Sequence, residues 1–200
     1  MGTAGPIDAY RFDGKTDPQI VSELLAAAEH PNSSNETRIA EVCGRYVELL
    51  KTELASGTRQ VQAIDGVNEL LEFLERREDA EVGLLTGNVR EGASLKLAAA
   101  GIDAARFRVG AFGSDHARRD QLPAIAAARA ETVMGFAPRG ESLVIIGDTP
   151  ADVTCGAALA ARAIGVATGA YSRADLRAAG AYAVFEDLSD TPAVVDAIFE

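Results

Sequence analysis

The spacing of apolar residues changes near residue 60 and divides the chain into two parts. Before that point, apolar residues recur every three or four positions, which is the spacing of one helix face. They form two stripes, which the polar segment HPNSSN separates. We expect two helices and no strand there. The first stripe contains Ile20, Val21, Leu24, Leu25 and Ala28, and the second contains Ile39, Val42, Cys43, Tyr46, Val47, Leu50 and Leu54.

The start of the first helix is marked by TDPQ, residues 16 to 19. Thr16 fits a helix N-cap, proline suits the first turn, and Gln19 stands where a capping box needs a side chain that reaches back. We therefore expect the first helix to begin directly after Thr16.

From Gly66 onward, short apolar runs alternate with helical patterns. The predicted strands are EVGLLT, VGAF, SLVIIGD, AIGVAT and AYAVF, and helical segments separate them. Strands joined by helices form right-handed crossovers in a mostly parallel, doubly wound sheet. We predict an α/β protein with a small helical lobe in residues 1–62 and an α/β core in residues 63–200.

Composition narrows the partners. A net charge of −11 argues against nucleic acids and anionic membranes, which select clustered Lys and Arg, and favours small ligands or cations. No apolar run is long enough for a membrane span, so we expect a cytoplasmic protein. Cys43 and Cys155 are expected to be buried reduced thiols, and His30 and His116 to be surface or structural residues.

Two predicted strand ends carry unusual chemistry. In LLTGN, Thr86 is followed by Gly87 and Asn88, so a hydroxyl and backbone N–H groups can meet an anion, although an ordinary turn uses the same residues. In IIGDTPAD, Asp148 ends a very apolar strand, where an unpaired carboxylate is costly and a cation is expected. Asp152 is either a second metal ligand or part of a capping box with Thr149.

Together these segments resemble the haloacid dehalogenase-like (HAD) hydrolase superfamily, in particular its phosphoglycolate-phosphatase-like branch. LLTGN is similar to that family's second motif, VIIGDTPADVTCG to its fourth, and GKTDPQIVSELL to the start of its helical cap. The resemblance implies a Rossmann-type core and Mg²⁺-dependent hydrolysis of a small phosphorylated metabolite through an aspartyl-phosphate. It assigns the phosphoryl group to Thr86, Gly87 and Asn88, Mg²⁺ to Asp148 and Asp152, and substrate contacts in the cap to Lys15 and Thr16.

The third motif of that family supplies a base, usually lysine. SDHARRDQLP offers only Arg118 and Arg119. The planar guanidinium of arginine can bind phosphate oxygens, but it does not replace the compact ammonium charge of lysine directly. We take Arg119 as the positively charged catalytic and phosphate-binding residue, with Arg118 as the alternative. The pair could also be two solvated surface arginines without a catalytic role.

The family's first motif, a strand ending in DxDG(T/S), is not found in these 200 residues. The nearest segment, RFDGKTD, lacks the spacing, and we interpret Asp13 as a residue at the entry to the helix rather than a nucleophile. In the family that strand lies between the strands of Thr86 and Asp148, so its absence should leave these two strands with unpaired edges. Because the motif also supplies the nucleophile, we expect no phosphatase activity. Either the chain begins at an internal methionine or the nucleophile has been lost.

Two other functions remain open on sequence. A non-catalytic module could retain the metal and phosphate pocket for binding alone. A response-regulator-like receiver also places acids and a threonine at strand ends, but it has no helical insertion comparable to residues 16 to 55. The sequence does not specify the substrate or the oligomeric state.

Overall fold

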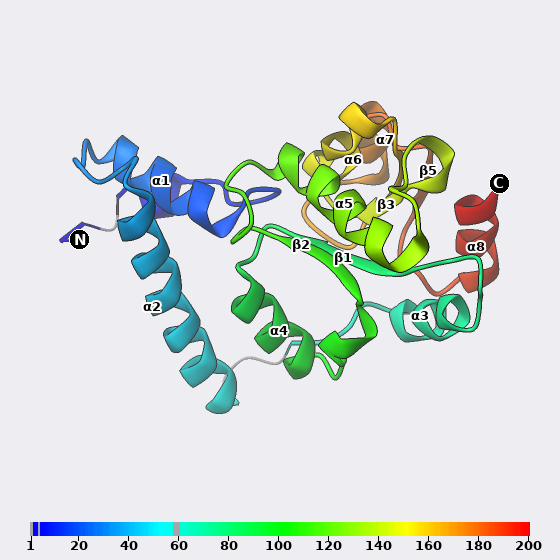
Figure 1. Ribbon diagram of the computed structural model, residues 1–200. Helices are drawn as coiled ribbons and strands as arrows, with labels where there is room; N and C mark the ends of the chain where they lie inside the picture. The colour runs from blue at the N-terminus through cyan, green and yellow to red at the C-terminus, as the bar shows by residue number, and fades with distance from the viewer. Residues whose placement is uncertain (1, 4, 58–60) are drawn as a thin grey trace.

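The computed structural model describes residues 2, 3, 5–57 and 61–200. The first part of the chain forms the expected helical lobe, built from α1 (Asp17–Ala27) and α2 (Glu36–Ala55), which pack on each other. A short 3₁₀ turn at Ile7–Ala9 precedes them. The lobe lies at one end of the molecule, and α2 also contacts α4 of the core (Figure 1).

Half of the predicted capping box forms at the start of α1. The Thr16 hydroxyl accepts a hydrogen bond from the backbone N–H of Gln19 at 3.2 Å. The Gln19 side chain, however, donates to Glu23 at 2.7 Å instead of returning to the cap. Helix α1 therefore begins where the sequence predicts, although a single cap contact holds its start.

The core alternates strands and helices as expected. Its strands are β1 (Gly83–Thr86), β2 (Val109–Phe112), β3 (Val144–Gly147), β4 (Arg162–Val166) and β5 (Ala183–Phe185). Its helices are α3 (Val67–Glu75), α4 (Arg90–Ala99), α5 (Leu122–Met134), α6 (Pro150–Cys155), α7 (Arg173–Ala178) and α8 (Thr191–Phe199). Short 3₁₀ turns lie at Ala104–Arg106, Arg119–Gln121, Gly140–Ser142 and Ala157–Leu159.

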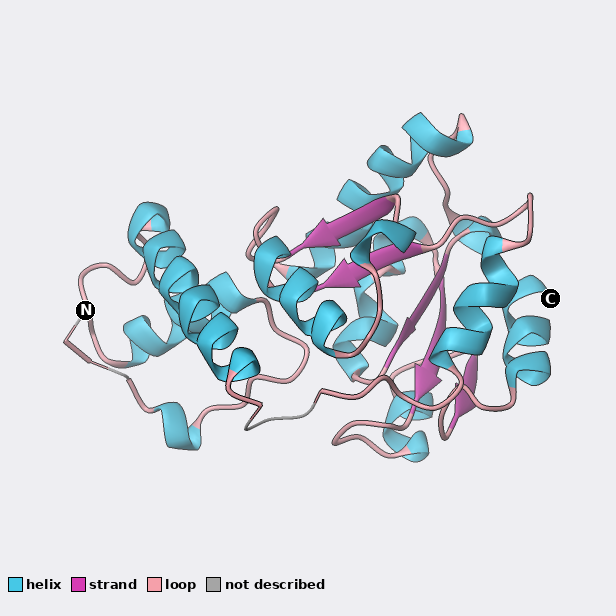
Figure 2. Ribbon diagram, turned by 90° about the horizontal axis from the view of Figure 1, so that it is seen from below, coloured by secondary structure: helices cyan, strands magenta, loops and turns pink. Residues whose placement is uncertain are grey.

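All strand pairs are parallel, but the strands form two sheets rather than one. β1 pairs with β2, with Thr86 opposite Phe112, and β3, β4 and β5 form a separate sheet in that order. Figure 2 shows the two groups of strands diverging from each other. Among the described residues, no backbone hydrogen bond joins the free edge of β1 or of β3 to another segment. The single continuous sheet of a doubly wound fold is thus interrupted between these two strands.

Helices cover both faces of the strands, as a doubly wound arrangement requires. In Figure 1, α5, α6 and α7 lie on one side and α3 and α4 on the other. Helix α5 packs on β1 and β2, while α6 and α7 pack on the second sheet. On the opposite side, α3 and α8 enclose a core cluster made of Leu70, Leu74, Val166, Leu188 and Val194.

Both cysteines are free and buried, which confirms the expectation for Cys43 and Cys155. The helix expected after Asp148 is shorter than its alanine-rich sequence predicts, because α6 ends at Cys155 and a 3₁₀ turn follows. Within the described ranges, no helix combines the length and hydrophobicity needed to span a bilayer.

Candidate active site

The carboxyl ends of β1 and β3 meet at the segment that leads into α1. A Cβ atom placed on Gly87, just after β1, would lie 2.2 Å from the carbonyl oxygen of Lys15. One placed on Gly14 would lie 3.1 Å from the Thr149 hydroxyl, just after β3. Because Gly14 and Lys15 are consecutive, the ends of β1 and β3 both lie beside the same short segment, even though the two strands do not pair.

The loop after β1 is organised around the Thr86 hydroxyl. Its oxygen accepts hydrogen bonds from the backbone N–H of Asn88 at 3.1 Å and from the Asn88 side-chain amide at 2.9 Å. Lys96 of α4 donates to the other end of that amide, the Oδ1 atom, at 2.5 Å. The Thr86 O–H proton and the Lys96 ammonium therefore lie in one chain of contacts, and both are donors suited to an anion.

The same loop is fixed to the helical lobe by Asp17, the first residue of α1. The Asp17 N–H donates to the carbonyl oxygen of Gly87 at 2.8 Å, and its carboxylate accepts from the N–H of Val89 at 2.8 Å. Burial raises the pKa of Asp17, while the hydrogen bond from Val89 and the charge of Lys96 act in the opposite direction. The lobe thus holds the geometry of the candidate phosphate loop.

Asp148 is a half-buried carboxylate at the end of β3. Burial makes the largest contribution to raising its pKa, and the neighbouring charge of Asp152 raises the pKa further. Asp13 adds to the same effect, and its side chain pairs with Arg11 at 3.6 Å. The backbone N–H of Asp148 and the positive charge of Arg119 act in the opposite direction and lower that pKa. A carboxylate in this environment fits a cation ligand.

Asp152 is buried and has both oxygens engaged. Its Oδ2 atom accepts from the N–H of Thr149 at 3.0 Å and from the Thr149 hydroxyl at 2.8 Å, which completes a reciprocal capping box on α6. Its Oδ1 atom forms a salt bridge with Arg119. The capping role considered from the sequence is therefore present, and a cation at Asp148 would meet Asp152 already paired.

The structure separates the two candidate arginines. Arg119 pairs with buried Asp152, and its Nε atom has no partner among the described residues. Arg118 instead pairs with Asp120 at 2.5 Å on the surface, with 70% of its side chain exposed. Of the two residues, only Arg119 lies beside the acids that follow β3.

Lys15 and Thr16, expected to contact substrate, are both engaged within the protein. The Lys15 ammonium bonds Glu23 at 2.6 Å and the Tyr10 hydroxyl at 2.7 Å. The Thr16 side chain is fully buried, and its hydroxyl donates to the Ala117 carbonyl at 2.5 Å. Thr16 thereby links the start of α1 to the segment before Arg119, and a direct substrate contact from either residue stays a prediction.

Asp17 and Lys96 were not singled out from the sequence. An acid in the first turn of a helix is common for its interaction with the helix dipole, so Asp17 gave no distinct signal. Lys96 comes eight residues after Asn88, and only the tertiary structure turns its helix face toward the loop.

The chain's acids do not form a ready-made metal cage. Within the described residues, no group of three or more His, Cys, Asp or Glu side chains is arranged to hold a metal ion. Asp148 would then be the principal protein ligand of a divalent cation, with remaining positions filled by water or substrate, as is usual for Mg²⁺.

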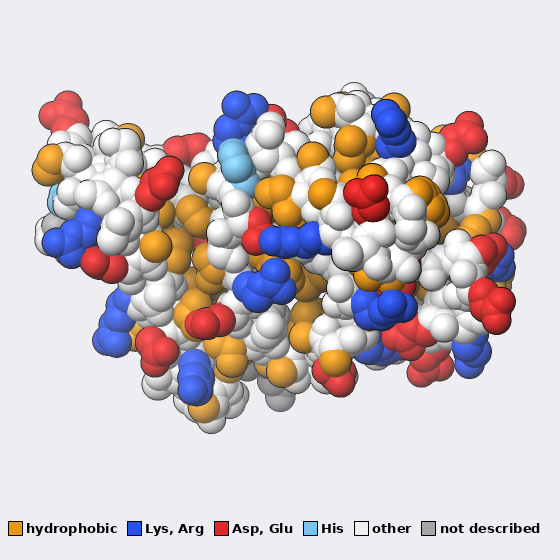
Figure 3. Space-filling view, in the orientation of Figure 1, with side chains coloured by type: hydrophobic (Ala, Val, Ile, Leu, Met, Phe, Trp, Pro, Cys, Tyr) orange, Lys and Arg blue, Asp and Glu red, His pale blue; other side chains and the backbone are white. Residues whose placement is uncertain are grey.

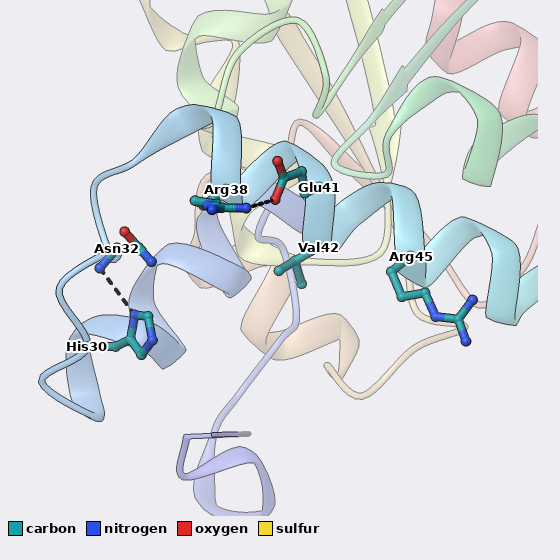
Figure 4. A pocket seen from close by; sticks show the side chains of 6 residues that line it. All are labelled: His30, Asn32, Arg38, Glu41, Val42 and Arg45. Atoms are coloured by element: carbon teal, nitrogen blue, oxygen red, sulfur yellow. Dashed lines mark hydrogen bonds and ion pairs between the residues drawn. The ribbon is translucent and has the colours of Figure 1, made fainter. Parts of the chain in front are cut away.

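A cavity of about 460 Å³ lies away from this site, on the helical lobe (Figure 4). Its polar groups are mostly paired with each other. Arg38 bonds Glu41 at 2.6 Å, and His30 accepts from the backbone N–H of Asn32 at 3.1 Å. His116 likewise accepts from the backbone N–H of Arg118 at 3.0 Å.

Part of the chain matches a known family model. Residues 117–191, which contain Arg119, Asp148 and Asp152, match the model of the family described as HAD-hydrolase-like. No curated protein matches the chain in sequence.

Several solved structures share the fold. A hydrolase from Pseudomonas syringae is 26% identical, with a TM-score of 0.62 over 82% of this chain and 71% of that one. A predicted phosphoglycolate phosphatase from Haemophilus somnus is 18% identical, with a TM-score of 0.60 over 88% of this chain and 74% of that one. A β-phosphoglucomutase from Clostridium difficile is 15% identical, with a TM-score of 0.64 over 93% of this chain and 78% of that one. In its fold, and in the sequence of residues 117–191, the chain is similar to haloacid dehalogenase-like hydrolases.

Proposed function

We propose that this chain carries the phosphoryl-positioning part of a cytoplasmic, Mg²⁺-dependent phosphomonoesterase that acts on a small phosphorylated metabolite. The Thr86 hydroxyl and the N–H group of Gly87 bind the phosphoryl oxygens, Asn88 orients the Thr86 hydroxyl, and Arg119 supplies positive charge nearby. Mg²⁺ held by Asp148 would neutralise the negative charge that phosphate brings to this acidic edge.

One observation carries the proposal. The ends of β1 and β3 both approach the two consecutive residues Gly14 and Lys15. This brings a hydroxyl donor, an underpaired carboxylate and an arginine to one edge of the core, which is where open parallel sheets bind ligands. The HAD-like match of residues 117–191 supports the same assignment.

The residues assigned so far position a phosphoryl group, but none of them attacks it. Covalent phosphoryl transfer requires a nucleophile, and Thr86, Asn88 and Arg119 are donors in this arrangement. Asp13 is an unassigned carboxylate whose charge helps to raise the pKa of Asp148. It follows no strand, and 41% of its side chain is exposed. We therefore propose that the 200-residue chain binds phosphomonoesters without hydrolysing them.

A binding module is the second candidate function. It is favoured by the pairing of Asp152 with Arg119 and Thr149, which leaves one free acid for a cation. The two candidates differ in turnover, and both require an anion at Thr86.

Activity is tested with Mg²⁺ and a panel of small phosphomonoesters that includes phosphoglycolate. We expect no release of phosphate by the chain alone. Turnover that disappears in Asp13→Asn would identify Asp13 as the nucleophile and overturn the proposed inactivity. Asp8→Asn is the matched control, since Asp8 is an exposed acid in the same segment.

The cation site is tested by the Mg²⁺-dependent shift of the melting temperature. We expect a weak shift that Asp148→Asn abolishes and that Asp152→Asn reduces less, because Asp152 is occupied by Arg119 and Thr149. The reverse order would move the site to Asp152, and an unchanged shift in both variants would remove it.

A further inference from the structure

A second cavity, of about 270 Å³, opens from the candidate phosphate loop into the space between β1, α3 and α4. Most of its wall is apolar and includes Val67, Leu84, Ala93, Leu97, Ala100 and Ile102. Its polar groups include Thr86, Asn88 and Lys96, the same three residues that are linked by hydrogen bonds at the end of β1. The cavity therefore has an apolar body with hydrogen-bond donors at one end, the usual character of a small-molecule site.

Lys96 gives this cavity its charge. The residue is half-buried, and its ammonium group donates a hydrogen bond to the neutral amide of Asn88. No carboxylate among the described residues lies within ion-pair distance of it. Asp17 acts on it only at longer range, and the Asp17 carboxylate is already bonded to the N–H of Val89. A partly buried ammonium without a counter-ion favours an anion beside it.

The opening of the cavity is partly apolar. Figure 3 shows hydrophobic side chains between the helical lobe and the core, with charged side chains of both signs around them. Ile64, which lines the cavity, has 39% of its surface exposed, so apolar surface extends to the opening. The volume suits a group of a few carbon atoms and is too small for a peptide segment.

We propose that this cavity holds the apolar organic group of a small phosphate monoester whose phosphate is bound by Thr86 and Lys96, with Asn88 holding the two donors in place. The inference rests on the proposed phosphoryl site, because Thr86 serves both. It narrows the substrate class to monoesters with a short hydrocarbon group, in place of strongly hydroxylated sugar phosphates.

The test is calorimetric binding of inorganic phosphate and of ethyl, butyl and hexyl phosphate. We expect affinity to rise about fourfold for each added methylene that enters the cavity, until the cavity is filled. Affinity that does not depend on chain length would overturn the proposal.

Matched variants locate the effect. Ala100→Leu fills part of the cavity and should remove most of the gain between ethyl and hexyl phosphate. Ala98→Leu, on the exposed face of the same helix, should keep it. An equal dependence on chain length in both variants would place the alkyl group elsewhere and overturn the proposal.

The phosphate end is tested separately with Lys96→Met. It should weaken binding of all four ligands about tenfold, the loss of one charge-assisted hydrogen bond, and leave the dependence on chain length unchanged. Equal affinity of wild type and Lys96→Met would overturn the assignment of the phosphate to Lys96. A further outcome separates the two proposals. If affinity rises with alkyl chain length, but inorganic phosphate does not bind and Thr86→Val does not weaken the binding of alkyl phosphates, the proposed hydrolase function fails while the assignment of the alkyl group to the cavity stands.

Discussion

The carboxylate of Asp17 accepts a hydrogen bond from the backbone N–H of Val89 at 2.8 Å, across 72 residues of sequence. Val89 is the N-cap residue of α4, so this contact satisfies the N–H group at the start of the helix that follows the candidate phosphate loop. The Asp17 N–H bonds the Gly87 carbonyl as well. One residue of the helical lobe therefore fixes both sides of Asn88.

Replacing Asp17 should destabilise the fold through this contact. Asp17→Ala leaves the N–H of Val89 without its partner, and we expect a loss of about 1–2 kcal/mol in the free energy of unfolding. Asp17→Asn keeps an acceptor oxygen and should lose less. Urea denaturation measures both, and equal losses in the two variants would show that the charge, not the hydrogen bond, matters.

The pH dependence of the same variants has a defined sign. Because the pKa of Asp17 is raised above its ordinary value of 3.8, the folded protein binds this proton more tightly than the unfolded chain. The contribution of Asp17 to stability is thus present below that ordinary value and is lost as the pH rises through the raised pKa. Thermal unfolding from acid to neutral pH should show this decline in wild type and a smaller one in Asp17→Asn. A larger decline in the variant would contradict the assignment.

Several features of the fold could be predicted from the sequence because they depend on local chemistry. Thr16 and Pro18 mark the start of α1, and the apolar runs ending at Thr86 and Asp148 mark β1 and β3. In each case the signal and the structure lie within a few residues of each other.

Other features depend on contacts between distant segments. The sequence left Asp152 open between a cap and a metal ligand, and its pairing with Arg119, 33 residues away, was visible only in the structure. Lys96 became a candidate because α4 turns it toward Asn88. The unpaired edges of β1 and β3 were expected from the family resemblance, but the division into two sheets was not predicted, because a strand's apolar pattern does not identify its neighbours.

The Arg119–Asp152 pair should be far more sensitive to mutation than the neighbouring Arg118–Asp120 pair. In the first pair the side chains are 14% and 8% exposed, so Arg119→Ala leaves a buried carboxylate uncompensated, at a cost of about 3–5 kcal/mol. Arg118→Ala removes an exposed arginine and should leave stability unchanged. Chemical denaturation of the two variants measures the difference. Equal stability would mean that Asp152 is held by Thr149 alone.

The interruption between β1 and β3 should be visible in amide hydrogen exchange. β4 has a parallel neighbour on each side, whereas β1 and β3 each have one. Backbone amides on an unpaired edge lack a strand partner, and Ile146 in β3 already has 36% of its surface exposed. Exchange measured by mass spectrometry should therefore be faster in peptides covering 83–86 and 144–147 than in the peptide covering 162–166. A hexyl phosphate bound at the end of β1 should slow exchange near Thr86 and leave 144–147 unchanged. Equal protection of all three strands would show that another segment covers the two free edges in solution.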